Sequence, residues 1–343
     1  MKKFNVAILG ATGVVGQEFL DLIAERRFPF DKLRLLASSR SAGKKIEFMG
    51  ASYTVEEAAA DSFAGIDIAL FAGGAVSKEL APCAVKAGAV VVDNSSAFRM
   101  DPAVPLVVPE VNPEALRGHN GIVANPNCST IIMVMALKPI YDLARIKRIV
   151  VSTYQAVSGA GKEAIDELDS QIAARAAGKE MQAAILPSAS LPKHYPIAFN
   201  LIPQIDVFLD NGYTKEEMKM VNETRKIMGD DKMAITATTV RVPVYRSHSE
   251  SINIELEKPL SLAEIKGVLS AFKGVVLEDD PAAMLYPMPL YTSKLNDVYV
   301  GRVRCDESAE NAWNLWVVGD QIRKGAALNT LQIAEKMIEM GLI

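Results

Sequence analysis

The stretch FNVAILGATGVVG, residues 4–16, decides the fold of the N-terminal part of the chain. Its first half, Phe4 to Leu9, is a short apolar run that is typical of a buried parallel strand. Glycines at positions 10, 13 and 16 permit a tight turn, and a helical pattern follows from about Val14 to Arg26. Backbone N–H groups in such a turn can approach a pyrophosphate, which the helix N-terminus also attracts. The stretch therefore predicts a dinucleotide-binding loop, against the alternative of a purely structural turn.

The pattern continues as alternating strands and helices as far as residue 127 and then changes. Strands are expected at 32–37, 67–71, 89–93 and 121–124, with a helix at 77–87. Repeated units of this size predict a doubly wound parallel (Rossmann) sheet. Later strands are expected at 146–154, 234–245, 251–256, 299–304 and 312–318, around helices at 129–143 and 215–228. Their period-two alternation predicts an α+β domain with a mixed, mostly antiparallel sheet.

These patterns divide the chain into two domains. We expect the nucleotide-binding domain at 1–127, completed by a helix within 321–343 that packs back on it, and a catalytic and dimerisation domain at 128–320. The long apolar strands of the second domain suggest an interface between two copies, hence a homodimer.

The amino-acid composition excludes several classes of function for this chain. The chain has 343 residues, 50% of them hydrophobic, with 37 basic and 41 acidic side chains for a net charge of −4. No basic surface points to a nucleic-acid partner, and no apolar run is long enough to cross a membrane. Three cysteines form neither a disulfide framework nor a zinc motif, so we expect no metal and a reducing, cytoplasmic location.

The end of the second predicted strand indicates which dinucleotide binds. The usual ribose-binding acid is absent from the segment Ala37 to Lys44, which carries Arg40 and Ser41 instead. A guanidinium and hydroxyl groups suit a 2′-phosphate, which a carboxylate would repel. The segment favours NADP over NAD, although Arg40 as a solvated loop cation is the alternative.

Cys128 is the best candidate nucleophile. It lies with Asn127 where a predicted strand ends and a helix begins, and a helix N-terminus favours the thiolate. Cys83 reads as a core residue and Cys305 has no nearby acid-base partner. Among the histidines, His248 lies between two strand runs, where catalytic groups are often placed, so it is the candidate acid-base partner, with a satisfied structural histidine as the alternative.

With these motifs in place, the whole chain resembles the aspartate-β-semialdehyde dehydrogenase family. The resemblance is carried by residues 10–16, 95–100, 125–130, 155–161, 216–219 and 241–250. Similar proteins reduce an acyl phosphate to an aldehyde with NADPH through a cysteine thioester. The resemblance implies reduction of L-aspartyl 4-phosphate to L-aspartate 4-semialdehyde, and the reverse oxidation with phosphate, in the biosynthesis of lysine, threonine, methionine and isoleucine.

The resemblance also implies a role for each site residue. Catalytic roles fall to Cys128, His248, Gln155 and Asn127; substrate binding to Arg241, Glu216 and Gln155; phosphate binding to Arg99 and Lys219; and NADP binding to Gly10, Thr12, Gly13, Val14, Val15, Arg40, Ser41, Ser158, Gly159 and Gln321. From sequence alone, Glu217 competes with Glu216 for the substrate ammonium, and Arg246 competes with Arg241 for its carboxylate. The alternative for Glu216 and Lys219 is a surface i,i+3 ion pair.

Two other functions are the alternatives. An N-acetyl-γ-glutamyl-phosphate reductase has the same architecture, but its substrate has no free α-ammonium to meet a Glu, and its motif is Gly-Cys-Tyr. A non-enzymatic NADP-binding redox sensor would leave Gln155, Glu216, Arg241 and His248 without a task.

Overall fold

The computed structural model describes residues 2–343 and divides the chain into two compact units. The first unit comprises residues 1–127 together with 325–343, and the second comprises 128–324. The C-terminal segment therefore returns to the N-terminal unit, four residues after the boundary that we expected at Gln321.

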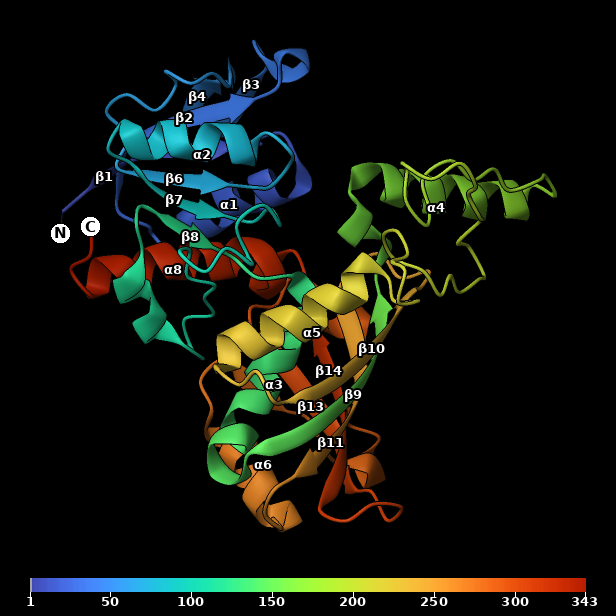
Figure 1. Ribbon diagram of the computed structural model, residues 1–343. Helices are drawn as coiled ribbons and strands as arrows, with labels where there is room; N and C mark the ends of the chain where they lie inside the picture. The colour runs from blue at the N-terminus through green and yellow to red at the C-terminus, as the bar shows by residue number, and fades with distance from the viewer. Residues whose placement is uncertain (1) are drawn as a thin grey trace. The chain divides into compact units, whose positions relative to one another are not determined.

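The N-terminal unit is built on a six-stranded parallel sheet (Figure 1). In spatial order its strands are β5 (Glu56–Glu57), β2 (Phe30–Ala37), β1 (Phe4–Leu9), β6 (Ile68–Phe71), β7 (Val90–Asp93) and β8 (Ile122–Ala124). A separate hairpin is formed by β3 (Lys45–Phe48) and β4 (Ala51–Thr54). Because β1 lies at the centre and the chain leaves it in both directions, the loop after β1 lies at the point where the strand order reverses, where dinucleotides bind in doubly wound sheets.

Helices bury both faces of this sheet. Helix α1 (Val14–Glu25) and the C-terminal helix α8 (Leu328–Glu339) share one apolar core with alternate residues of the central strands. Helix α2 (Ser77–Lys86) packs against the residues of those strands that point the other way. The strands are therefore apolar on both sides, as their continuous hydrophobic runs predicted.

The second unit contains a six-stranded mixed sheet. Its spatial order is β10 (Ala234–Arg241), β9 (Ile146–Gln155), β11 (His248–Leu256), β14 (Ala312–Gly319), β13 (Val298–Cys305) and β12 (Val275–Leu277). The three central pairings are antiparallel, and the outer pairs β9–β10 and β12–β13 are parallel. The predicted mixed sheet is confirmed.

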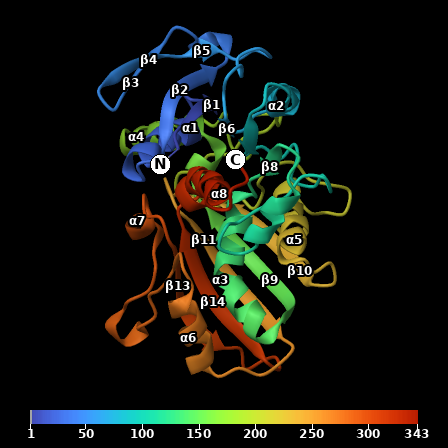
Figure 2. The same cartoon turned by 90° about the vertical axis from the view of Figure 1, so that its left-hand side faces the viewer.

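Helices α3 (Cys128–Ala144), α5 (Lys215–Met228) and α6 (Leu262–Ala271) lie along one face of the mixed sheet (Figure 1). Figure 2 shows the same helices beside its strands from a second direction. On the opposite face the rings of Tyr154 and Trp316 contact each other, with centroids 5.5 Å apart, and a short helix α7 (Pro289–Thr292) adjoins β14. This arrangement gives the sheet one fully packed face.

Three element boundaries in the second unit and at the C-terminal helix differ from the sequence prediction. Strand β10 ends at Arg241 rather than at Tyr245, because Pro243 cannot continue a strand ladder. Strand β11 begins at His248, so this histidine is the first residue of a strand and not part of a loop. The C-terminal helix begins only at Leu328, after a π-helical turn at Arg323–Ala327.

Helix α4 (Lys162–Ala176) was not predicted, and it holds the proline-rich segment that follows it. Its buried Glu167 accepts hydrogen bonds from the N–H groups of Ala184 and Ile185, and Gln171 accepts from Ile197 and Ala198. The irregular segment therefore has its backbone donors satisfied by side chains of α4 rather than by a ladder.

Candidate active site

The glycine loop of the N-terminal unit has the properties of an anion-binding turn. Gly10 has φ +82°, and a Cβ on Gly16 would lie 2.1 Å from the Gly10 carbonyl oxygen, so glycine is required for this close packing. Among the described residues no side chain caps the start of α1, and its first turn carries no acid. The N–H groups of this turn and the positive end of the helix therefore suit the pyrophosphate of a dinucleotide.

A second loop adjoins the glycine loop. The Thr12 hydroxyl donates to the Ser41 hydroxyl over 3.3 Å, which brings the turn after β2 beside the turn after β1. Arg40 is exposed in that turn, where a phosphate is able to reach it. Thr12 and Ser41 are thus in contact, and Arg40 precedes Ser41 in the same turn.

Arg99 also belongs to the N-terminal unit, and its orientation is fixed by backbone. Its Nε donates to the Asn125 carbonyl oxygen over 2.9 Å, and its Nη2 donates to the Asn94 carbonyl oxygen over 2.7 Å. The two asparagine side chains hydrogen-bond to each other over 2.8 Å. Arg99 is a buried, oriented cation rather than a solvated loop residue.

Three strand ends in the second unit bring the predicted polar residues together. Gln155 and Arg241 are paired across the parallel strands β9 and β10, and His248 opens the antiparallel neighbour β11. Cys128 is the first residue of α3, which covers this face, and Asn127 precedes it as the last residue of the N-terminal unit. Residues far apart in sequence therefore meet at one edge of the sheet.

His248 is fully buried and its ring is oriented by the backbone. Its Nδ1 accepts the Ala156 N–H over 3.0 Å, and its Nε2 lies 3.4 Å from Gln155 Nε2. Burial, together with the charge of Arg241, lowers the pKa of His248 to about 3. The imidazole of the free protein is therefore neutral at physiological pH, and Nε2 is the nitrogen that remains for a ligand.

Arg241 is buried with an unused donor. Its Nη1 donates to the Ala156 carbonyl oxygen over 2.7 Å, whereas its Nε has no partner among residues 2–343. Burial lowers the pKa of Arg241, and the negative charges of Glu216 and of the Cys128 thiolate oppose that shift. A buried guanidinium with a free N–H is costly unless a ligand such as a carboxylate completes it. Arg246, the competing arginine, instead pairs with Asp320.

The structure distinguishes Glu216 from Glu217, between which the sequence alone could not decide. Glu217 belongs to the capping box of α5: its Oε2 accepts the Thr214 N–H, and its Oε1 accepts the Thr239 N–H. Glu216 faces the site, where its Oε1 accepts Gln155 Nε2 over 3.2 Å and its Oε2 lies 3.0 Å from Lys219 Nζ. In this pair Glu216 is buried beside Gln155 and Lys219 is half-buried, so it is not a solvated surface ion pair.

The remaining predicted residues of this unit adjoin the same site. Gln321 donates to the Ser158 hydroxyl over 2.6 Å and accepts the Ser247 N–H over 2.8 Å. A Cβ on Gly159 would lie 2.9 Å from Arg241 Nη1 and 3.2 Å from the His248 ring, so a side chain here would obstruct both groups. Cys83, in contrast, is a half-buried residue of α2 in the other unit.

Models of known families match both parts of the chain. The NAD binding domain of semialdehyde dehydrogenases matches residues 5–119, and their dimerisation domain matches residues 137–324. The aspartate-semialdehyde dehydrogenase of Bacillus subtilis is 54% identical, and that of Aquifex aeolicus 56% identical, each over 99% of both chains. The chain belongs to the aspartate-semialdehyde dehydrogenase family.

Solved structures of the family agree with the architecture. Aspartate semialdehyde dehydrogenase II of Vibrio cholerae superimposes with a TM-score of 0.93 at 48% identity, covering 98% of this chain and 99% of that one. The Candida albicans dehydrogenase, solved with NADP, gives a TM-score of 0.76 at 25% identity over the full length of both chains. The predicted doubly wound domain followed by a mixed-sheet domain is thus confirmed as the fold of this dehydrogenase family.

Several groups that orient the site of this dehydrogenase were not predicted from the sequence. The Thr153 hydroxyl donates to Gln155 Oε1 over 3.0 Å, and the backbone of Ala156 contacts both His248 and Arg241. A backbone contact does not depend on residue type, so the sequence gives no signal for Ala156. Thr153 lies two residues before Gln155 and therefore on the same face of the strand, so its contact with Gln155 could have been inferred from the sequence.

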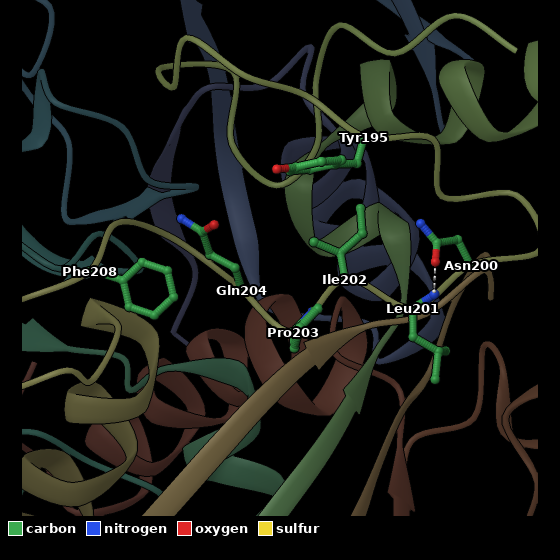
Figure 3. Close-up of a pocket in the computed structure, with 7 residues that line it drawn as sticks. All are labelled: Tyr195, Asn200, Leu201, Ile202, Pro203, Gln204 and Phe208. Atoms are coloured by element: carbon green, nitrogen blue, oxygen red, sulfur yellow. Dashed lines mark hydrogen bonds between the residues drawn. The ribbon is translucent and has the colours of Figure 1, made fainter.

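A surface pocket of about 340 Å³ lies beside residues 200–204 (Figure 3), and none of the predicted site residues lines it. Within the described residues no helix is long and apolar enough to span a membrane.

Proposed function

We propose that this chain catalyses the NADPH-dependent reduction of L-aspartyl 4-phosphate to L-aspartate 4-semialdehyde, and the reverse, phosphate-dependent oxidation. Membership of the family supports the reaction and its place in amino-acid biosynthesis. The observation that carries the proposal is the buried, incompletely bonded guanidinium of Arg241 beside the charge of Cys128 and of Glu216. An amino acid needs such a pair of opposite charges next to the nucleophile that attacks its side chain.

The charges of the site match those of the substrate. Arg241 is proposed to bind the α-carboxylate and Glu216 the α-ammonium, with Gln155 between Glu216 and His248. Lys219 and Arg99 are proposed to bind the phosphate. The pKa of Lys219 is raised because two carboxylates outweigh the effect of burial, so the amine is charged and suited to an anion.

The chemistry follows from Cys128. Its thiolate attacks the β-carbonyl carbon, N–H groups in the first turn of α3 stabilise the oxyanion, and phosphate leaves with the bonding electron pair. The product is a thioester, whose carbon accepts the hydride that NADPH supplies when bound. His248 is proposed to act at Nε2 as the acid-base group that exchanges a proton with the resulting oxygen, and expulsion of the thiolate releases the aldehyde.

NADP is proposed as the dinucleotide. The exposed Arg40 beside Ser41 and Thr12 supports recognition of a 2′-phosphate, and Gly10, Gly13, Val14 and Val15 form the turn for the pyrophosphate. In the second unit, the linked side chains of Ser158 and Gln321 and the bare backbone of Gly159 support a further contact with the cofactor.

A homodimer in the cytoplasm is proposed as the working form. The match to a dimerisation domain supports the dimer, as do the exposed apolar side chains of Met284, Leu290 and Tyr291. Trp316 donates to the Pro287 carbonyl oxygen, so this segment adjoins the sheet face opposite α3. The absence of any disulfide among the described cysteines supports a reducing location.

The test is phosphate-dependent formation of NADPH from NADP and aspartate semialdehyde, followed at 340 nm. Cys128→Ala is expected to abolish turnover, because no thioester forms. Cys83→Ala, which removes a thiol from the other unit, is the matched control and is expected to retain it. Turnover by Cys128→Ala, with its fold verified by circular dichroism, would remove the thiol from the mechanism.

The same assay separates the alternatives. A redox sensor forms no NADPH from the aldehyde, and a reductase of the N-acetylglutamyl class prefers N-acetylglutamate semialdehyde. Glu216 and its bond to Gln155 favour the free amino acid, because an acylated amine offers no positive charge to a buried carboxylate.

A further inference from the structure

Residues 202–208, here called the strap, connect the two substrate-binding elements of the second unit. At one end Ile202 and Arg241 exchange both backbone hydrogen bonds, at 2.9 and 3.0 Å. At the other end the Val207 carbonyl oxygen accepts the Lys215 N–H over 2.9 Å, at the start of α5. Figure 3 shows Ile202, Pro203 and Gln204 along a surface pocket, with Phe208 at its border. The strap is thus anchored at both ends and borders solvent.

The strap places Asp206 against Lys219. Asp206 Oδ2 lies 3.1 Å from Lys219 Nζ, which is also 3.0 Å from Glu216 Oε2. The backbone of Asp206 has φ +68°, a conformation that asparagine and aspartate tolerate best among residues with side chains. Its Oδ1 accepts the Val207 N–H over 2.8 Å, which fixes the carboxylate toward Lys219.

Two carboxylates on one ammonium give this group of three a net negative charge, which weakens the attraction of Lys219 for a phosphate. Release of one carboxylate from Lys219 would therefore strengthen phosphate binding. Glu216 is the poorer candidate: its side chain is 7% exposed, and it also accepts Gln155. The Asp206 side chain is 32% exposed, so water can solvate it after it releases Lys219. Replacement of a carboxylate by phosphate on Lys219 therefore requires less free energy at Asp206 than at Glu216.

We propose that Asp206 is a positioning residue that holds Lys219 in the unliganded enzyme and yields it to the phosphate group of the substrate. The proposal rests on the phosphate-binding role of Lys219 given above. Because carboxylate and phosphate compete for the same ammonium, Asp206 sets the affinity for phosphate without contacting the reacting carbon.

The test is Asp206→Asn, which keeps the backbone conformation and the acceptor for Val207 but removes the charge. In the oxidative direction the KM for inorganic phosphate is expected to fall about fivefold, the limit for a partly exposed ion pair. The KM for aspartate semialdehyde and kcat should change less than about twofold, since the reacting groups are untouched. Asp210→Asn, the same change on an exposed residue of the same loop, is the control and should leave the phosphate KM unchanged.

The outcomes are distinct. An unchanged or raised phosphate KM in a folded Asp206→Asn protein, or an equal fall in Asp210→Asn, would overturn the proposal. Inhibition by sulfate against phosphate gives a second measurement, and the same tightening is expected there. A wild-type protein that forms no NADPH with phosphate would instead refute the proposed function, so the two failures are told apart.

Discussion

His248 shows how a single buried side chain couples the site to pH. Its pKa is about 3 in the folded protein, against about 6.5 when unfolded. Between these values the unfolded chain binds a proton that the folded chain does not, so the free energy of unfolding falls as pH falls below about 6.5. Above that pH both states are neutral and the histidine has no effect on stability.

Replacing His248 with Asn should remove this acid sensitivity. The Asn Oδ1 can accept the Ala156 N–H in place of Nδ1, and it does not titrate. Between pH 7 and pH 5 the wild type is expected to lose about 2 kcal/mol more unfolding free energy than His248→Asn. Urea denaturation of both proteins at the two pH values measures this difference. Equal losses would show that the histidine is not held neutral.

At the residue scale, the sequence predicts which types of side chain the site contains better than it predicts which of two adjacent, identical residues faces the site. Cys128 and His248 are candidates by motif and chemical type, and Gln155 and Arg241 by the family resemblance. The structure places Gln155 beside His248 and Arg241 and puts the charge of Cys128 within reach of Arg241. The decision between Glu216 and Glu217 depends on which carboxylate caps α5, because both lie in its first turn. Asp206 could not be found from sequence, since it meets Lys219 only through the path of the strap.

At the scale of elements, the glycine loop depends on one close contact. A Cβ on Gly16 would lie 2.1 Å from the Gly10 carbonyl oxygen and 2.7 Å from the Ala11 Cα, and backbone cannot yield as a flexible side chain can. A Cβ on Gly13 would have its nearest neighbour at 3.4 Å. Gly16 therefore has no space for a side chain, whereas Gly13 has space for a Cβ, although both belong to the same motif.

Gly16→Ala is expected to destabilise the protein without NADP by about 1–3 kcal/mol, the usual cost of overpacking. Gly13→Ala, the matched control, should unfold within a degree or two of the wild type. Thermal unfolding followed by circular dichroism compares them. If both variants unfold together, the helix–strand contact at Gly16 is not the reason for the third glycine.

Helix α4 was not predicted from sequence for a physical reason. Its buried residues are Ala164, Glu167, Leu168 and Gln171, so half of its buried face is polar. Polar side chains that bind backbone N–H groups from inside are indistinguishable in sequence from solvated ones. Their role is apparent only when the proline-rich segment that they hold is in place.

At the scale of the whole molecule, mutation of exposed apolar residues tests which surface forms the proposed dimer interface. Leu290 and Tyr291 are 78% and 68% exposed on the single chain, unusually high for large apolar residues that are adjacent. Leu290→Asp is expected to convert dimer to monomer at micromolar concentration, as measured by light scattering. Met49→Asp, on an equally apolar exposed residue of the N-terminal unit, is the control and should leave the molecular mass unchanged. A dimeric Leu290→Asp protein would place the contact elsewhere.

The return of α8 to the first unit has a consequence for how the chain matures. Leu328, Leu331, Ile333, Ala334 and Met337 complete the core on the α1 side of the parallel sheet. During translation these residues are synthesised after the second unit, so until then only α1 covers that side of the parallel sheet. The nucleotide-binding unit therefore completes its core only after the second unit has been synthesised, and a chain that stops after residue 324 leaves exposed the apolar surface that α8 would cover.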